Sequence, residues 1–197
     1  MNTIFITFEG IDGSGLSTQA ALLNDFFIKN GKQCVLTKEP TNNIIGGIIR
    51  AGLRREWKVN NLTIQNLFAA DRSHHLESEI EPALKKRKIV VCDRYVLSTI
   101  AFGALDVPLE YLKQINSLFR KPDITFIIDV HPAVSIERMK KARYHVEMFE
   151  TEQRLKQTRQ NYLALKNFFP NTFIIDGNNP IEQVHKDVLS VIRKQLY

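Results

Sequence analysis

The sequence predicts an α/β fold in which a five-stranded parallel sheet is flanked by helices, and three observations support this prediction. Short apolar runs alternate with segments of helical periodicity along the 197 residues. The runs are apolar at successive positions, as is typical of parallel strands that helices cover on both faces. The first run also leads into a glycine-rich loop that a helical pattern follows at once, which is the setting of a phosphate-binding loop.

The strands are predicted from β-branched and aromatic runs at residues 4–9, 34–36, 89–92, 124–128 and 173–175. Helical spacing of apolar residues predicts a helix after the first strand, ending at Asn30-Gly31, and a closing helix around residues 181–192. Three further helices are predicted at 63–84, 108–120 and 149–169. The length suits one hydrophobic core, so we expect a single domain over residues 1–197.

The composition narrows the class of partner. The chain has 27 Lys and Arg against 21 Asp and Glu, a formal charge of +6, which favours small anionic partners such as phosphorylated metabolites. The basic residues are scattered apart from the run 85–88, so a nucleic-acid partner is not expected. Cys34 and Cys92 lie in apolar runs without metal-ligand spacing, and Glu9 interrupts the first apolar run well short of membrane-spanning length. We therefore expect a cytoplasmic protein without a membrane segment.

The loop after the first strand predicts binding of ATP and Mg²⁺. In the pattern G-x-x-x-x-G-K-[ST], backbone N–H groups surround the phosphates, the lysine reaches the β and γ oxygens, and the hydroxyl ligates Mg²⁺. The chain keeps each of these elements except the lysine, whose position is occupied by leucine. The candidate nucleotide-binding residues are Gly10, Ile11, Asp12, Gly13, Ser14, Gly15, Leu16, Ser17 and Thr18.

Charged residues follow the other strands, where the ligands of an open parallel sheet are expected. Asp93, at the end of the third run, is predicted to hold Mg²⁺ together with Ser17. Arg94 beside it can hold an acceptor phosphate through two parallel hydrogen bonds. These charges predict a polyanion site, with a strand-end ion pair as the alternative for Asp93 and Arg94.

Four features together resemble the thymidylate kinases: the phosphate loop, Phe68-Ala-Ala-Asp-Arg72, Asp93-Arg94-Tyr95 followed by Ser98, and Pro122-Asp123. They occur in the same order over almost the whole chain. The resemblance implies a P-loop nucleoside monophosphate kinase that transfers a phosphoryl group from ATP to dTMP with Mg²⁺, giving ADP and dTDP, and it implies a homodimer.

The resemblance also assigns roles on the acceptor side. It implies that Phe68 stacks on thymine, Arg72 contacts the base and Arg94 holds the acceptor phosphate. A helix places Phe68 and Arg72 on one face, which agrees with these roles, although an aromatic at such a position is commonly a core residue. The remaining implied contacts are Asp12 near the sugar hydroxyl or the metal, Glu39 and Pro40 in the acceptor loop, and Ser98, Thr99 and Phe102 along the sugar and base pocket.

A lid is implied at about residues 138–150, a stretch rich in cations that otherwise would be taken as a solvated helix face. Members of the family carry an arginine either in the phosphate loop or in the lid, and Gly13 at the loop position places this chain in the second group. Arg143 is then the expected cation over the transferring phosphate.

Leu16 leaves three possibilities open. A cation from elsewhere, such as Lys140, Lys141 or Arg143, replaces the lysine; the chain is a slow kinase or one for another deoxynucleotide; or it binds nucleotide without catalysis. Loss of one charge donor at a transition state costs on the order of 100- to 1000-fold in rate, whereas the loop's backbone N–H groups still bind anions. We favour an active kinase, because the acceptor side keeps the residue types that it needs.

Overall fold

The computed structural model describes residues 3–142 and 151–196, and within them an all-parallel sheet has the strand order β2-β3-β1-β4-β5. The predicted five-stranded sheet is therefore confirmed. Its strands are β1 (Phe5–Glu9), β2 (Cys34–Lys38), β3 (Ile89–Asp93), β4 (Ile124–Asp129) and β5 (Thr172–Asp176).

Helices connect the strands and cover both faces of the sheet. None of those in the described residues is long and apolar enough to cross a membrane. They are α1 (Leu16–Lys29), α2 (Ile44–Leu53), α3 (Asn61–His75), the π-helical turn η1 (Leu76–Ile80), α4 (Glu81–Lys85), α5 (Val96–Gly103), α6 (Leu109–Ile115), α7 (Pro132–Ala142), α8 (Glu152–Ala164) and α9 (Ile181–Leu196).

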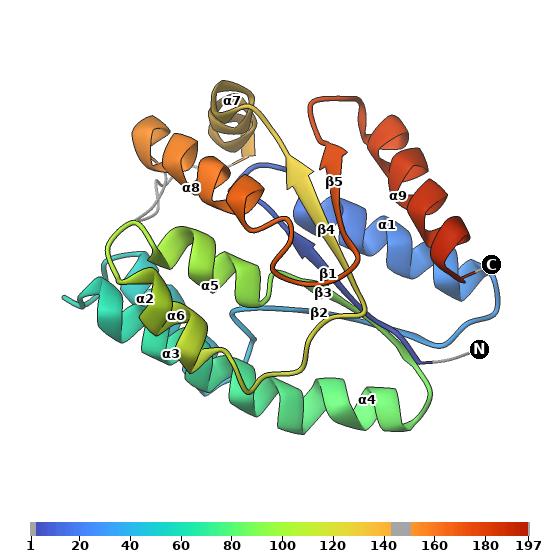
Figure 1. The fold of residues 1–197 in the computed structure, drawn as a ribbon, viewed down its shortest axis with the longest axis horizontal. Coiled ribbons are helices and arrows are strands. Elements are labelled where there is room, and N and C mark those ends of the chain that lie inside the picture. Colours follow the sequence, from blue (N-terminus) through green and yellow to red (C-terminus); the bar gives the residue numbers. More distant parts are fainter. Residues whose placement is uncertain (1–2, 143–150, 197) are drawn as a thin grey trace.

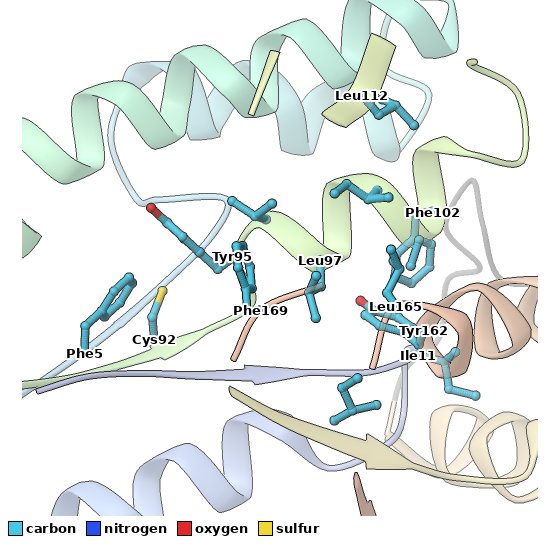
Figure 2. Packing of buried hydrophobic residues seen from close by; sticks show 14 of the residues in the cluster. Phe5, Ile11, Cys92, Tyr95, Leu97, Phe102, Leu112, Tyr162, Leu165 and Phe169 are labelled. Carbon is cyan, nitrogen blue, oxygen red and sulfur yellow. The ribbon is translucent and has the colours of Figure 1, made fainter. Parts of the chain in front are cut away.

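The two faces of the sheet carry separate hydrophobic cores. Helices α1 and α9 pack on one face, while α4, α5, α6 and α8 pack on the other (Figure 1). Figure 2 shows the second core, in which Phe102 of α5 lies beside Tyr162 of α8. Strands β1, β3 and β4 are almost wholly buried, which explains their continuous apolar runs.

Three predicted helices differ from the observed ones. The segment 63–84 begins two residues earlier and is interrupted by the π-helical turn η1 between α3 and α4. The segment 108–120 ends at Ile115, and the described part of 149–169 is helical only from Glu152 to Ala164. Short helices α2 and α5 were not predicted separately, because their apolar runs are too brief for periodicity to distinguish them from strands.

Candidate nucleotide site

One cavity of about 730 Å³ opens at the carboxyl ends of the strands. It brings together residues from the loop after β1, from the ends of β2 and β3, and from helices α3 and α5. Gly10 and Arg143 apart, every candidate site residue lines it: Ile11, Asp12, Gly13, Ser14, Gly15, Leu16, Ser17, Thr18, Glu39, Pro40, Phe68, Arg72, Asp93, Arg94, Ser98, Thr99 and Phe102. Arg143 lies outside the described residues.

The glycine-rich loop has the backbone of an anion cradle. Gly15 precedes α1 with φ 92° and Gly13 has φ 71°, conformations that favour glycine, and α1 starts at Leu16 with its first N–H groups facing the loop. A side chain on Gly13 would also clash, since a Cβ there would lie 2.7 Å from the Ser135 carbonyl oxygen of α7. The loop is thus narrow, and its N–H groups and the helix terminus favour phosphate.

Leu16 occupies the position of the lysine in the loop pattern, and its side chain is buried hydrocarbon. Its side chain is 5% exposed and belongs to the α1-side core, together with Ile128 of β4 and Val184 of α9. It also lies over the start of the loop, because a Cβ on Gly10 would approach Leu16 Cδ2 to 3.4 Å. Leu16 therefore contributes packing and no charge to the cavity.

The two residues expected to hold a metal meet directly. Asp93 is the last residue of β3, Ser17 lies in the first turn of α1, and Ser17 Oγ donates to Asp93 Oδ2 at 2.5 Å. Hydroxyl and carboxylate oxygens suit Mg²⁺, which binds few protein ligands when substrate phosphates supply others. No cluster of three or more His, Cys, Asp and Glu able to hold a metal occurs in residues 3–142 and 151–196, so this pair is the candidate.

Arg94 is oriented by the phosphate loop itself. Its Nη2 donates to Asp12 Oδ1 at 2.7 Å, its Nη1 donates to the Gly10 carbonyl oxygen at 2.8 Å, and its guanidinium lies over the Phe102 ring at 5.4 Å. The residue adopts φ 70°, which is uncommon for a side chain other than glycine and occurs disproportionately at functional sites. Arg94 is therefore rigidly placed between the loop and α5.

Arg72 forms the floor of the acceptor side. It is 1% exposed, and its guanidinium donates to Glu39 Oε2 at 2.7 Å, to Thr99 Oγ1 at 2.9 Å and to Asn116 Oδ1. Phe68, one turn earlier on α3, is half-buried and faces the same cavity. The cavity thus combines a ring and a buried guanidinium with a glycine-rich anion cradle, which suits a phosphorylated nucleotide.

Comparisons with known proteins agree with this geometry. Residues 8–188 match the family model described as thymidylate kinase. The chain belongs to the thymidylate kinase family. Proteins named "Probable thymidylate kinase" from Pyrococcus horikoshii and Pyrococcus abyssi are 36% and 38% identical over 202 and 203 residues, covering 100% of this chain and 98% of each relative. One from Pyrobaculum calidifontis is 39% identical over 196 residues, covering 98% of this chain and 97% of the relative.

Glu9, which is not among the candidate residues named above, supports one side chain of the cavity wall, Ser98. It is fully buried beneath the cavity, accepting from the Leu97 N–H at 3.1 Å and from Ser98 Oγ at 2.6 Å, and Ser98 in turn contacts Tyr162 Oη at 2.8 Å. Burial raises the pKa of the Glu9 carboxyl to about 7, despite the opposing effects of Ser98 and Arg94. A carboxylate at the end of a buried, mostly apolar strand is the sign that the sequence offers.

The expected lid is described only over residues 138–142, which form the last turn of α7. Lys140 and Lys141 are exposed there and do not line the cavity, and Lys141 pairs with Glu137 at 2.8 Å. Arg138 and Met139 line it instead, and Arg138 Nη2 donates to the Gly177 carbonyl oxygen at 3.0 Å. In this conformation neither Lys140 nor Lys141 is placed to replace the loop lysine.

Proposed function

We propose that this member of the family transfers a phosphoryl group from ATP to dTMP, giving ADP and dTDP. The observation that supports this best is that one cavity joins the glycine-rich loop to Phe68, Arg72 and Arg94. ATP phosphates would lie on the loop and the N-terminus of α1, and thymine would lie against Phe68 and Arg72. The phosphoryl group would then pass from ATP on the loop to the acceptor phosphate beside Arg94.

The chemistry asks more for positioning and charge than for proton transfer. The acceptor phosphate is already an anion near neutral pH, so no general base is required. Arg94, fixed by Asp12, would hold that phosphate in line with the transferring group. Ser17 and Asp93 would hold Mg²⁺, which supplies neutralisation of the phosphate charge when bound.

Phe102 gives the proposed site a preference for deoxyribose. Its ring is 8% exposed, lines the cavity and is held between the Arg94 guanidinium and Tyr162, so it cannot turn aside easily. Bulk at this position would exclude a ribose 2′-hydroxyl. We expect dUMP to be turned over faster than UMP, and comparable kcat/KM values for these two nucleotides would contradict the assignment.

The proposed enzyme acts in the cytoplasm as a homodimer. Apolar side chains remain exposed on the neighbouring helices α2 and α3, among them Ile44 at 83%, Ile48 at 42% and Leu62 at 45%. Such a surface is typical of a contact with another protein, and the family resemblance favours a second copy of the chain. Size-exclusion chromatography with mass detection should give twice the monomer mass, and the monomer mass at micromolar concentration would contradict the dimer.

An ADP-release assay with dTMP, dUMP, dCMP, dGMP and thymidine tests the proposal. ADP should appear fastest with dTMP. A higher kcat/KM with another acceptor would identify a kinase for that nucleotide. No ADP with any acceptor, alongside measurable ATP binding, would identify a nucleotide-binding protein without catalysis, a reading that the family membership and the ordered acceptor side make unfavourable.

A further inference from the structure

The loop without a lysine leaves the transferring phosphate in need of a cation. Five Lys and Arg side chains among the described residues line the cavity, and four of them are arginines that already donate to protein oxygens. Arg50 donates to the Pro40 and Thr41 carbonyl oxygens, and Arg72 donates to Glu39. Arg94 donates to the Gly10 carbonyl oxygen and to Asp12, and Arg138 donates to the Gly177 carbonyl oxygen.

Lys38 is the fifth, and within residues 3–142 and 151–196 its ammonium has no hydrogen bond or ion pair. It is the exposed last residue of β2, and its Cα is paired with that of Asp93 across the sheet. The lysine therefore stands one strand away from the carboxylate that contacts Ser17. Its side chain is free to move toward a ligand at that point.

The alternation of side chains along β2 sets which way Lys38 points. Cys34 packs with the α1-side core and Val35 with the opposite core. Thr37 follows Val35, donating to Glu79 at 2.8 Å and contacting His75 at 2.7 Å. With a period of two, Lys38 shares the face of Cys34, which is the face of α1 and of the phosphate loop.

Lys38 also stands at a boundary between two hollows. Lys38, Ser17 and Asp93 line both the main cavity and a second one of about 600 Å³ beside β2. A side chain at this boundary can approach the metal position from the β2 side, whereas a loop lysine would approach from the position of Leu16. Lysine suits this role, since its ammonium is a compact charge on a flexible stem.

We propose that Lys38 Nζ contacts the transferring phosphate beside Ser17 and Asp93 and supplies the charge that the loop lacks at Leu16. This inference rests on the proposed function and adds a catalytic residue to it. Lys38 lies beside the proposed metal ligands Ser17 and Asp93, so it stabilises the negative charge of the transferring phosphate and does not contact the dTMP base.

A double-mutant cycle between positions 16 and 38 tests the assignment. Lys38→Met should lower kcat about 100-fold, with little change in the KM for dTMP or in the affinity for ADP, which has no γ-phosphate. The same change in a Leu16→Lys background should cost less than about threefold, because the loop lysine then supplies the charge. Lys38→Arg should keep most of the activity, and Lys29→Met, at an exposed lysine ending α1, is the matched control.

The outcomes separate cleanly. Equal losses from Lys38→Met in both backgrounds, or no loss in the wild-type background, would overturn the assignment of Lys38 while leaving an active kinase. A wild-type chain that releases no ADP in the same assay would overturn the proposed function itself. Thermal unfolding of each variant shows whether a loss of activity reflects loss of the fold, and Lys38→Gln, which also removes the charge, repeats the test if Lys38→Met is unstable.

Discussion

The acceptor wall and the phosphate loop of this site are built in opposite ways. On the acceptor wall, Arg72 and Arg94 are held by several hydrogen bonds each, and Arg72 is buried. On the loop, the side chain at the charged position is apolar, and among the cations that line the cavity in residues 3–142 and 151–196, the one without a hydrogen bond or ion pair is exposed Lys38. If the proposed roles hold, recognition of the acceptor is preorganised, whereas charge at the transferring phosphate depends on an exposed lysine that carries no hydrogen bond within the described residues.

Removing Arg94 attacks the preorganised side and should have the largest effect. Arg94→Ala is expected to lower kcat/KM for dTMP on the order of 1000-fold, because a desolvated charge partner of the phosphate is lost and Asp12 is left without its cation. Steady-state kinetics with varied dTMP gives the value.

Arg94→Lys is the matched variant for this prediction. It keeps the charge but replaces the planar guanidinium with a single ammonium, which cannot bind a phosphate through two parallel hydrogen bonds, so an intermediate loss is expected. If kcat/KM for dTMP falls less than about tenfold in Arg94→Ala, another group holds the acceptor phosphate. The hydrogen bonds that fix Arg94 would then not serve acceptor binding.

The same two regions show how far the sequence could be interpreted. The five strands and the loop followed from continuous apolar runs and glycine spacing, since both are local properties of the chain. Arg72 donates to Asn116 and Thr99, which come from distant segments of the chain and have no signature in the local sequence. The π-helical turn η1 and the early end of α6 at Ile115 likewise have no sign in the periodicity of the sequence.

The free cation could not be found from the sequence for a different reason. Lys38 follows the second strand, and nothing in the local sequence distinguishes it from the other cations of the cavity. Only the hydrogen bonds of Arg50, Arg72, Arg94 and Arg138 exclude those four. Lys140 and Lys141 were plausible from charge density alone, and the structure places both outside the cavity. The composition gives the number of cationic side chains, whereas their hydrogen bonds and ion pairs in the fold decide which of them can contact a ligand.

The raised pKa of the buried Glu9 carboxyl predicts that the stability of the fold depends on pH. Because its folded pKa of about 7 lies above the ordinary value near 4.5, the folded state keeps a proton that the unfolded chain has lost. The stability that this gives is complete below pH 4.5 and is lost as pH rises through 7, a change of about 3 kcal/mol in the free energy of unfolding.

Glu9→Gln tests this contribution, because the neutral amide cannot titrate. Denaturant unfolding at pH 5 and pH 8.5 should show the wild type losing more stability than the variant between these values. Ser98→Ala is a useful control: it removes the hydroxyl that donates to Glu9 but keeps the carboxyl, so the pH dependence should persist or grow. Parallel pH profiles for wild type and Glu9→Gln would show that Glu9 is ionised throughout and that burial is offset by its partners.

Leu16→Lys changes the other side of the comparison, and its expected effect is the smallest. A loop lysine would add a second charge at the transferring phosphate, so kcat should rise about tenfold while Lys38 is present, with the KM for dTMP unchanged. The variant should be less stable than the wild type without nucleotide, because a nearly buried leucine leaves the α1-side core, and ATP should restore more stability to it. Unfolding temperatures with and without ATP measure this, and an unchanged or lower kcat would mean that the loop has been rebuilt around leucine.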